Sequence, residues 1–567
     1  MSHAELIVWE RGAEDKRQCL EIPADLNGST LADLLALHDF PLNTRCGQRG
    51  WCRGCMVELR EGELLDEAGA TVVAGGLLRS CQVYVPRGGR VVLEVPERAH
   101  IGAPPQVGET FLIDVPFGLA PLFAPKDGRD TGFAVDIGTT TVVVLLVDLA
   151  SGVILSRAGG FNAQIRFGDN VLTRIGAGSS PTVRRAMRRA LVEETLGPLM
   201  HKACERAGRE PSRLAGGVLA GNTTMFHILA DEDPTSLGVA PFKARFLEGR
   251  LLEAADIGLA ECGFDPAMPL QLLPGLAAYV GADITAGVHA TGMTYDLTPS
   301  LLVDMGTNGE VVLCVEGRLV GCATAAGPAF EGSGLSSGTR AQNGAIETVR
   351  LELGPFAVEI GAIGGQPAAA NAGICGSAYV DFLASGRACG LLQANGRFDR
   401  NRWLEIPDEY RIEDADGLAF RLAGDPGGAG PRISEIDIAH LLQAKAAIGA
   451  GIDTLLDVTG ISARDIGHIY LAGGFGMHID VANAIGMGLL PGFCTAQVRV
   501  VGNTSLAGAL LALLDRAALE SMEGLRDRIE VIELNLEDAF EDRYIDHLSL
   551  SMQESPVDPK LDFFITI

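Results

Sequence analysis

The first hundred residues alternate short apolar strands with polar turns around a single helix. Residues 4–9 and 18–23 alternate apolar and polar side chains, as half-buried strands do. Residues 29–40 (STLADLLALHDF) place apolar side chains at helical spacing, with Ser29 or Thr30 as the expected N-cap. CMVELREGELL, RSCQVYV and GRVVLEV predict further strands. This order is typical of a small α/β domain.

The pattern changes after residue 98. Residues 99–130 are rich in Pro and Gly and have no sustained period, so they predict a linker that either swings or packs on the surface. Apolar strands return at 132–157 and 301–327, and helical periodicity is found at 182–208 and 433–456. The basic face of the helix at 182–208 is expected to be solvated. The expected division is a first domain at 1–98, a linker at 99–130, a middle domain at 131–210 and a C-terminal domain at 211–567.

The composition restricts the class of partner. The chain has 567 residues and a net charge of −27, which argues against nucleic acid and anionic membranes as partners. The N-terminus has no secretion signal, and no apolar run approaches the roughly 18 residues of a membrane span. We therefore expect a cytoplasmic protein, in which clustered cysteines bind metal or act in redox chemistry rather than forming disulfides.

Four cysteines of the first domain have the spacing of an iron–sulfur site. Cys46, Cys52 and Cys55 lie in RCGQRGWCRGC, and Cys81 follows after 25 intervening residues. Four thiolates are what a 2Fe–2S cluster requires, and plant-type ferredoxins have the pattern C-x4-C-x2-C with a distant fourth cysteine. The extra residue in the first gap resembles adrenodoxin-like ferredoxins. Zinc prefers paired C-x2-C knuckles, of which only one is present. The prediction is a β-grasp 2Fe–2S ferredoxin domain.

Two segments of the body repeat one phosphate-binding pattern. DIGTTTVVV at 136–144 aligns with DMGTNGEVV at 304–312, and each is an apolar strand, a Gly-Thr turn and a second apolar strand. Glycines allow tight turns, backbone N–H groups and threonine hydroxyls hold phosphate oxygens, and the aspartates can hold Mg²⁺ through water. The predicted nucleotide and Mg²⁺ site comprises Asp136, Gly138, Thr139, Thr140, Asp304, Gly306, Thr307 and Asn308.

A third segment, HIYLAGGFGMHID at 468–480, predicts a strand that runs into Gly473, Gly474 and Gly476 before a helix begins. Glycines there would let a nucleoside lie against the backbone, and the helix N-terminus would favour phosphate. The three segments together resemble the superfamily of acetate kinase, sugar kinases, heat-shock chaperones and actin. The resemblance implies a duplicated ribonuclease-H-like α/β fold with ATP in a cleft that opens and closes.

Two carboxylates are candidates for water activation. YVGADITAGV at 279–288 is similar to a segment of the superfamily's sugar kinases whose aspartate acts as base, which makes Asp283 a candidate for orienting the attacking water. Glu331, in AAGPAFEGSG, is a second candidate as base or metal partner. Asp283 could instead cap a helix. Residues 220–230 and 371–386 either line the cleft or start core helices.

A ferredoxin domain joined to such a body, with the motifs GNTTM, GPAFEG, DMGTNGE and AGGFG, looks like the reductive activators of corrinoid proteins. The resemblance covers about residues 3–545. It implies ATP-dependent, one-electron reduction of a corrinoid protein from Co(II) to methyl-accepting Co(I), an external electron donor such as a ferredoxin or flavoprotein, and a homodimer formed through part of the middle domain.

Other functions fit some of the same features. A small-molecule kinase with a redox-regulatory ferredoxin domain would transfer phosphate to a small molecule instead of releasing it. An activator of 2-hydroxyacyl-CoA dehydratases is also an ATP-driven electron donor, but it carries a 4Fe–4S cluster at a dimer interface and has no ferredoxin domain. A redox sensor would bind ATP without turnover.

Overall fold

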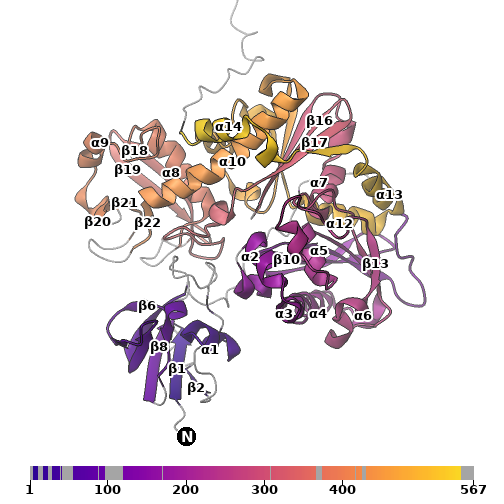
Figure 1. Ribbon diagram of the computed structural model, residues 1–567, viewed down its shortest axis with the longest axis horizontal. Helices are drawn as coiled ribbons and strands as arrows, with labels where there is room; N and C mark the ends of the chain where they lie inside the picture. The colour runs from indigo at the N-terminus through magenta and orange to yellow at the C-terminus, as the bar shows by residue number, and fades with distance from the viewer. Residues whose placement is uncertain are drawn as a thin grey trace, which may run out of the picture.

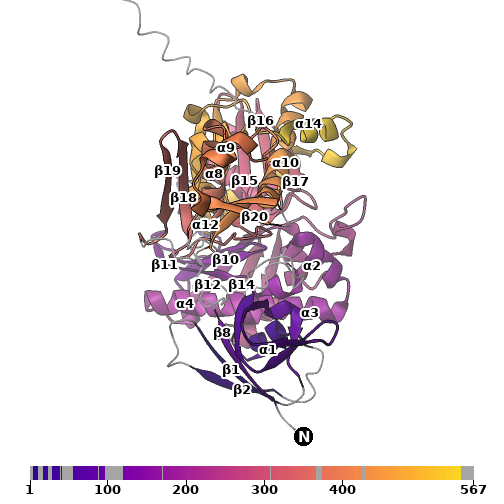
Figure 2. The same ribbon diagram turned by 90° about the vertical axis from the view of Figure 1, so that its left-hand side faces the viewer.

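The computed structural model (Figures 1 and 2) shows a ferredoxin-like domain and a larger two-sheet body. It describes residues 4–10, 17–22, 29–38, 40, 42, 55–86, 89–95, 111, 119–168, 170–306, 308–365, 373–414, 417–423 and 430–550. Within these ranges, no helix is both long and apolar enough to cross a bilayer.

The N-terminal domain is a five-stranded sheet with one helix against it. The sheet has the order β2-β1-β8-β3-β6, in which β1 and β8 are parallel. Thr30 is the N-cap of the helix α1 (Leu31–Leu37): its hydroxyl accepts a hydrogen bond from Asp33 N, and the Asp33 carboxylate accepts one from Thr30 N. The strands are β1 (Ala4–Glu10), β2 (Gln18–Ile22), β3 (Met56–Glu61), β6 (Leu77–Arg79) and β8 (Gly89–Val95), with β4 (Glu63–Asp66), β5 (Thr71–Val73) and β7 (Val83–Tyr84) in a small second sheet.

The last part of the expected linker is docked on the body. Ala120 N and Leu122 N donate to the carbonyls of Leu514 and Leu513, and Arg516 N donates to the carbonyl of Ala120. This stretch therefore pairs with the end of a body helix and cannot act as a swinging tether. Residues 96–110 and 112–118 lie outside the described residues.

The middle part of the body is built on a six-stranded sheet of order β11-β10-β9-β12-β14-β13. β9 and β10 are antiparallel, as are β10 and β11, whereas β12 runs parallel to both β9 and β14. The strands are β9 (Thr131–Ile137), β10 (Thr141–Asp148), β11 (Ile154–Phe161), β12 (Leu214–Gly221), β13 (Arg250–Glu253) and β14 (Pro269–Leu272). The helices are α2 (Val171–Gly178), α3 (Pro181–Leu191), α4 (Gly197–Ala207), α5 (Thr223–Leu229), α6 (Ala254–Ile257) and α7 (Ala282–Thr291).

The second sheet repeats five strands of the first in the same order. Its order is β24-β23-β15-β16-β17-β25, so three antiparallel strands, β15, β16 and β17, are extended by the parallel strands β23 and β24 next to β15. The strands are β15 (Ser300–Met305), β16 (Gly309–Val315), β17 (Arg318–Thr324), β23 (His468–Ala472), β24 (Val498–Gly502) and β25 (Ile529–Val531). The duplicated ribonuclease-H-like fold is confirmed.

Elements inserted between β17 and β23 form a separate lobe, drawn in salmon and orange in Figure 1. It contains β18 (Ile346–Leu353), β19 (Phe356–Ala362), β20 (Arg411–Asp414), β21 (Gly417–Arg421), β22 (Arg432–Ser434), α8 (Gly376–Ala388) and α9 (Arg400–Glu405). The helix predicted at 433–456 is α10 (Glu435–Thr459), which Ser434 caps through Asp437 N. The chain continues with α11 (Val481–Gly486), α12 (Thr504–Leu514), α13 (Arg516–Leu525) and α14 (Phe540–His547).

The expected boundary at residue 210 falls inside the first sheet. β12, which follows that position, pairs with β9 along its whole length, and the side chains of Val218 and Phe133 lie in one core. Division at 210 would therefore expose both strands. The sheet pairings support a boundary near residue 297, between α7 and β15, and we propose it in place of 210.

The two halves meet where α7 crosses α12. Both helices follow the pattern V-G-x4-A-G, at residues 280–287 and 501–508. A Cβ on Gly287 would lie 2.8 Å from Thr504 Oγ1, and a Cβ on Gly508 would lie 2.5 Å from the Cα and Cβ of Ala286. Glycine at both positions therefore allows the close approach of two helices that join the halves.

Replacing Gly508 with alanine is expected to lower the free energy of unfolding by about 1–3 kcal/mol, because the added methyl group overpacks the crossing. Urea denaturation followed by circular dichroism measures the change. Gly524→Ala is the matched control: Gly524 lies in α13, and a Cβ there would meet nothing within 4 Å, so this change should stabilise by up to about 1 kcal/mol. Equal effects of the two substitutions would show that the crossing tolerates a side chain.

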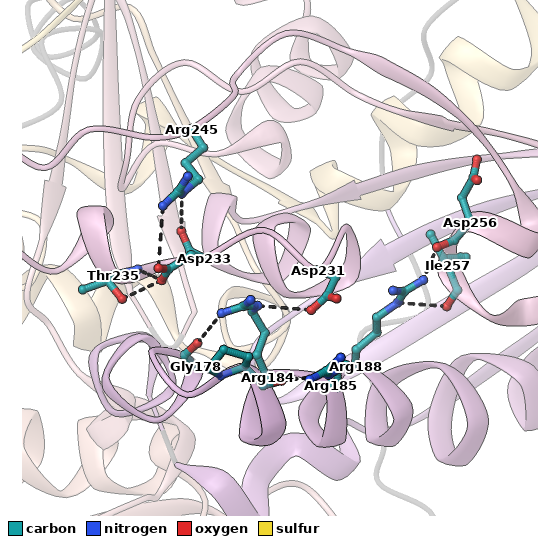
Figure 3. A network of polar contacts seen from close by, with 11 residues as sticks. Gly178, Arg184, Arg185, Arg188, Asp231, Asp233, Thr235, Arg245, Asp256 and Ile257 are labelled. Atoms are coloured by element: carbon teal, nitrogen blue, oxygen red, sulfur yellow. Dashed lines mark hydrogen bonds and ion pairs between the residues drawn. The ribbon is translucent and has the colours of Figure 1, made fainter.

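The basic face of α3 is only partly solvated: Arg185 and Arg189 are exposed as expected, whereas Arg184 and Arg188 bind neighbouring segments (Figure 3). Arg184 pairs with Asp231 and donates to the carbonyl of Gly178, and its side chain is only 12% exposed. Arg188 donates to the carbonyls of Asp256 and Ile257 at the end of α6, where a cation is favourable. These contacts fix α3 to the segment that follows α5 and to the end of α6.

Candidate functional site

The two repeated hairpins and the start of α7 line one cavity of about 130 Å³. Most of the residues predicted from the sequence lie here. The lining residues are Asp136, Gly138, Thr139, Thr140, Thr141, Asn222, Asp283, Asp304, Gly306, Asn308, Glu310, Glu331, Gly473, Gly474, Asn503 and Ser505. Thr307 lies outside the described residues.

Hairpin 1, residues 136–141, is a tight turn between β9 and β10. Gly138 N donates to Thr141 O at 2.9 Å, and a Cβ on Gly138 would lie 2.7 Å from the same oxygen. A side chain at this position would therefore open the turn, as the sequence pattern predicted. Thr139 and Thr140, which follow, are both buried at the cavity wall.

Hairpin 2, residues 304–309, connects β15 to β16. Gly306 N donates to Asn308 O at 3.0 Å, but a Cβ on Gly306 would meet no atom closer than 3.8 Å. A side chain would therefore clash with the protein at Gly138 but not at Gly306. Asp304 stands directly opposite Glu310 across the strand pair, so hairpin 2 contributes two carboxylates to the cavity.

Asp136 is held by two side chains from the far end of the sequence. Asn503 Nδ2 donates to Asp136 Oδ2 at 2.8 Å, and Ser505 Oγ donates to Asp136 Oδ1 at 2.7 Å. Burial raises the pKa of Asp136, and these two hydrogen bonds oppose the rise. The carboxylate is therefore oriented by α12 while it faces the cavity.

The other carboxylates of the cavity are also buried, and this raises their pKa values. Burial, and then the charge of Asp136, raises the pKa of Asp283 to about 7. Burial, followed by the charges of Asp283 and Asp136, raises the pKa of Asp304 to about 8. The pKa of Glu310 is also raised well above its ordinary value, mainly by burial. Such a group of buried acids is stabilised by a cation or by protons.

The donor set fits a hydrated Mg²⁺ ion with a nucleotide. Among the described residues, no three His, Cys, Asp or Glu side chains gather closely enough to bind a metal directly. Mg²⁺ keeps several waters and takes one or two carboxylates together with substrate phosphates. Asp136 and Asp304 are placed to accept hydrogen bonds from such waters, and the turn amides and threonines of the hairpins suit phosphate oxygens.

The Gly-rich turn after β23 separates this cavity from a second one. Gly473 has a φ of 92°, and a Cβ there would lie 2.4 Å from Met305 O, so the residue must be glycine. Gly474 lines both cavities, whereas Gly476 lines neither and packs near Leu471. The helix expected next is split into a 3₁₀ turn, Gly476–His478, and the six-residue α11, so little helix dipole is available.

The second cavity, of about 140 Å³, has the features of a nucleoside pocket. It is lined by the stacked rings of Phe330 and Phe475, whose centroids are 5.3 Å apart, and by Gly376 and Ser377 at the start of α8. Glu347 and His478, with 3.3 Å between Oε1 and Nδ1, lie on its wall and also on that of a wide groove beyond. The segment 371–386 therefore both lines the cleft and starts a core helix.

Asp283 and Glu331 both reach the first cavity. Asp283 lies in the first turn of α7, where Gly281 is the N-cap, and its Oδ1 accepts a hydrogen bond from Ile284 N at 3.0 Å. Glu331 ends the 3₁₀ turn Pro328–Glu331 and lines both cavities. Their predicted role in orienting water stays a prediction.

Four lining residues had not been predicted: Thr141, Glu310, Asn503 and Ser505. A fifth, Asn222, lies in the segment 220–230, which both lines the cavity and starts α5. Glu310 left a signal, because it takes the place of the apolar Val142 when the two hairpins are aligned. Asn222 and Asn503 also left one, since GNTT at 221–224 and GNTS at 502–505 both follow a strand and open a helix.

The ferredoxin domain brings two of the four predicted cluster cysteines together. Cys55 precedes β3 and Cys81 lies in the 3₁₀ turn Ser80–Gln82; both are buried, and Ser80 N donates to Cys55 O at 3.1 Å. Gln82 Nε2 lies 3.7 Å from Cys81 Sγ, as a donor to sulfur. Cys46 and Cys52 lie outside the described residues. Two buried cysteines in one apolar core, on segments joined by a backbone hydrogen bond, fit an iron–sulfur cluster.

Three family models match the chain. They are described as the 2Fe-2S iron-sulfur cluster binding domain over residues 13–86, the RACo middle region over 131–296, and the C-terminal domain of RACo, the ASKHA domain, over 298–561. The first confirms the prediction of a 2Fe–2S ferredoxin domain. The other two meet near residue 297, where the sheet pairings also change.

Named relatives and a solved structure match as well. The corrinoid activation enzyme RamQ of Eubacterium limosum is 30% identical over 551 residues, covering 86% of this chain and 90% of that protein. A [Co(II) methylated amine-specific corrinoid protein] reductase of Methanosarcina barkeri is 28% identical over 307 residues, covering 50% of this chain and 52% of that protein. The solved structure of a reductive activator for a corrinoid, iron-sulfur protein is 28% identical, with a TM-score of 0.70 over 98% of this chain and 100% of that one.

Proposed function

Since the chain belongs to the family of reductive activators of corrinoid proteins, we propose that it uses ATP to return a corrinoid protein from Co(II) to Co(I). One observation carries the proposal: a single chain combines a ferredoxin domain with a cavity formed by two facing phosphate hairpins. The reaction adds one electron to Co(II). The 2Fe–2S cluster supplies single electrons, and bound ATP with Mg²⁺ supplies the free energy of hydrolysis.

Each group of residues has a proposed task. Thr139, Thr140 and the turn amides of both hairpins bind phosphate oxygens, and Asp136 and Asp304 hold the waters of Mg²⁺. Asp283 or Glu331 orients the water that attacks the terminal phosphate. Cys46, Cys52, Cys55 and Cys81 are the proposed ligands of the cluster.

ATP is needed because Co(II)/Co(I) lies at a very low potential. Each 59 mV of deficit lowers a one-electron equilibrium tenfold. A nucleotide can offset this only if the protein binds the partner with different affinity in its two conformations. The two halves are joined through α7 and α12, and the nucleotide cavity lies between their hairpins. A movement of one half against the other would supply the two conformations. We therefore expect different affinities for the Co(II) and Co(I) forms of the partner.

The remaining parts of the proposal come from the family resemblance. An external one-electron donor, such as a ferredoxin or flavoprotein, recharges the ferredoxin domain. The protein acts as a homodimer in the cytoplasm, where a reducing environment keeps its twelve cysteines from forming disulfides.

The proposal predicts ATP-dependent cobalt reduction. The protein, a reductant and a Co(II) corrinoid protein are mixed with and without Mg·ATP, and the cobalt spectrum is followed. Conversion to Co(I) should be at least about tenfold faster with ATP, which corresponds to about 1.4 kcal/mol. Equal rates without nucleotide would contradict the proposal, and transfer of phosphate from ATP to a small molecule would favour a kinase.

A further inference from the structure

Hairpin 1 is held by three asparagine side chains that come from three separate elements. Asn162 Nδ2 donates to Gly138 O at 2.9 Å, and Asn222 Nδ2 donates to Thr139 Oγ1 at 2.9 Å. Asn503 Nδ2 donates to Asp136 Oδ2 at 2.8 Å. The three bonds fall on the aspartate, the glycine and the first threonine of the hairpin.

Each of these asparagines is also the N-cap of a helix. Asn162 Oδ1 accepts from Gln164 N at 3.0 Å at the start of the 3₁₀ helix Ala163–Phe167. Asn222 Oδ1 accepts from Met225 N at 3.0 Å in α5, and Asn503 Oδ1 accepts from Leu506 N at 2.8 Å in α12. A backbone N–H can only face the amide oxygen, so the NH₂ group must face hairpin 1. The cap thereby fixes the direction of the second hydrogen bond.

The bond to Thr139 has a chemical consequence. A hydroxyl has one hydrogen to donate and two lone pairs that accept. Because Thr139 Oγ1 accepts from Asn222, its own hydrogen is left to donate in another direction, and the nucleotide cavity lies beside it. Asn222 itself lines that cavity, and its Cα would lie 2.7 Å from a Cβ on Gly281 at the start of α7. Its position is therefore closely set by its neighbours.

Hairpin 2 is supported differently. In the repeated sheet order, β12 beside β9 corresponds to β23 beside β15. Ala220 lies opposite Asp136 as Ala472 lies opposite Asp304, so Asn222 corresponds to Gly474. Gly474 has no side chain with which to cap a helix or to donate to hairpin 2. The support by capping asparagine at this position is therefore a property of hairpin 1 alone.

We propose that Asn222 is a positioning residue that turns the Thr139 hydroxyl into a hydrogen-bond donor to a phosphate oxygen of the nucleotide. Asn162 and Asn503 fix the positions of Gly138 and Asp136, which lie in the same hairpin as Thr139. The inference rests on the proposed ATP-driven function, because it names how the same cavity orients its phosphate-binding group.

Asn222→Asp tests the inference, because aspartate is as good an N-cap as asparagine and α5 should keep its start. The new carboxylate oxygen facing Thr139 can only accept, so the hydroxyl must donate to it and is lost to the phosphate. We expect kcat/KM for ATP hydrolysis, measured as phosphate release without a corrinoid protein, to fall about 10- to 100-fold. The new carboxylate also adds charge to the buried acids of the cavity, so the melting temperature without nucleotide should fall, and the uncharged Asn222→Ser separates this effect from the loss of the hydroxyl.

A double-mutant cycle with Thr139→Val distinguishes positioning from a structural role. If Asn222 acts through the Thr139 hydroxyl, the uncharged Asn222→Ser costs nothing further in the Thr139→Val background. Additive losses of Asn222→Ser and Thr139→Val, or wild-type hydrolysis by Asn222→Asp, would overturn the inference. Asn395→Asp is the matched control, since Asn395 Oδ1 accepts from Arg397 N in a turn remote from both hairpins, and it should hydrolyse ATP normally.

A second variant and a comparison with cobalt reduction separate failure of this inference from misfolding and from failure of the proposed function. Asn222→Ser preserves a capping hydroxyl but is too short to donate to Thr139, so it should show the same loss if the aspartate variant does not fold. Because the assay contains no cobalt, a wild-type protein that hydrolyses ATP without reducing a corrinoid protein would contradict the proposed function and leave this inference intact. The reverse result, cobalt reduction with unaffected Asn222→Asp hydrolysis, would contradict only the inference.

Discussion

Replacing Cys81 with serine is expected to abolish cobalt reduction while ATP hydrolysis continues near the wild-type rate. Cys81 is buried beside the Cys55 segment, and a 2Fe–2S cluster needs two thiolates for each iron. Serine does not supply a soft thiolate, so the visible absorbance and the electron paramagnetic resonance signal of the reduced cluster should be lost. The rate of Co(I) formation should fall more than about 100-fold, which corresponds to about 2.7 kcal/mol or more.

Cys19→Ser is the matched control for this prediction. Cys19 lies in the same domain, on β2, and its side chain is exposed. It is outside the predicted cluster set, so both cluster signals and cobalt reduction should persist. Loss of the cluster in Cys19→Ser together with its retention in Cys81→Ser would contradict the assignment of the ligands.

The sequence predicted the parts of the site that depend on local chemistry. Gly138 could be recognised because a Gly-Thr turn between two apolar strands occurs twice, at Gly138 and at Gly306. The N-cap of α1 could be narrowed to Ser29 or Thr30, and the structure has Thr30. In each case the physical reason lies within a few neighbouring residues.

The parts that could not be predicted depend on contacts between distant segments. Asn503 and Ser505 reach Asp136 across more than 360 residues, and only the packing of α12 on the first sheet brings them there. Arg184 and Arg188 of α3 looked like part of a solvated face because their partners, Asp231 and the end of α6, lie on other elements. The boundary near 297 likewise depends on strand pairings that local periodicity does not encode.

The hydrogen bonds to Asp136 connect α12, from the second half of the chain, to the cavity. α12 belongs in sequence to the second half, yet it packs on the first sheet and supplies the two side chains that bind Asp136. α7 lies against α12 and presents Asp283 to the same cavity. A nucleotide bound between the hairpins therefore contacts groups that are fixed by the two crossing helices, and a change in their crossing would be felt directly at the phosphate site.

Replacing Asp304 with asparagine is expected to stabilise the nucleotide-free protein while reducing ATP hydrolysis about 100-fold or more. Burial and the nearby Asp283 and Asp136 raise the pKa of Asp304 to about 8, compared with about 3.9 in an unfolded chain. The folded state therefore binds a proton that the unfolded state releases, and stability falls as pH rises from about 4 to about 8. Asparagine resembles the protonated acid and does not titrate.

The melting temperature of Asp304→Asn should therefore exceed that of the wild type, by a margin that is small at pH 5 and grows up to pH 8. With Mg·ATP bound, the wild type should melt at a higher temperature than Asp304→Asn, because the wild-type carboxylate gains a cation and asparagine does not. Asp127→Asn, at a side chain that is 82% exposed, is the control and should change neither quantity. A variant that is less stable at every pH, or that hydrolyses ATP normally, would show that Asp304 is a structural carboxylate and that the charge in this cavity does not serve the nucleotide.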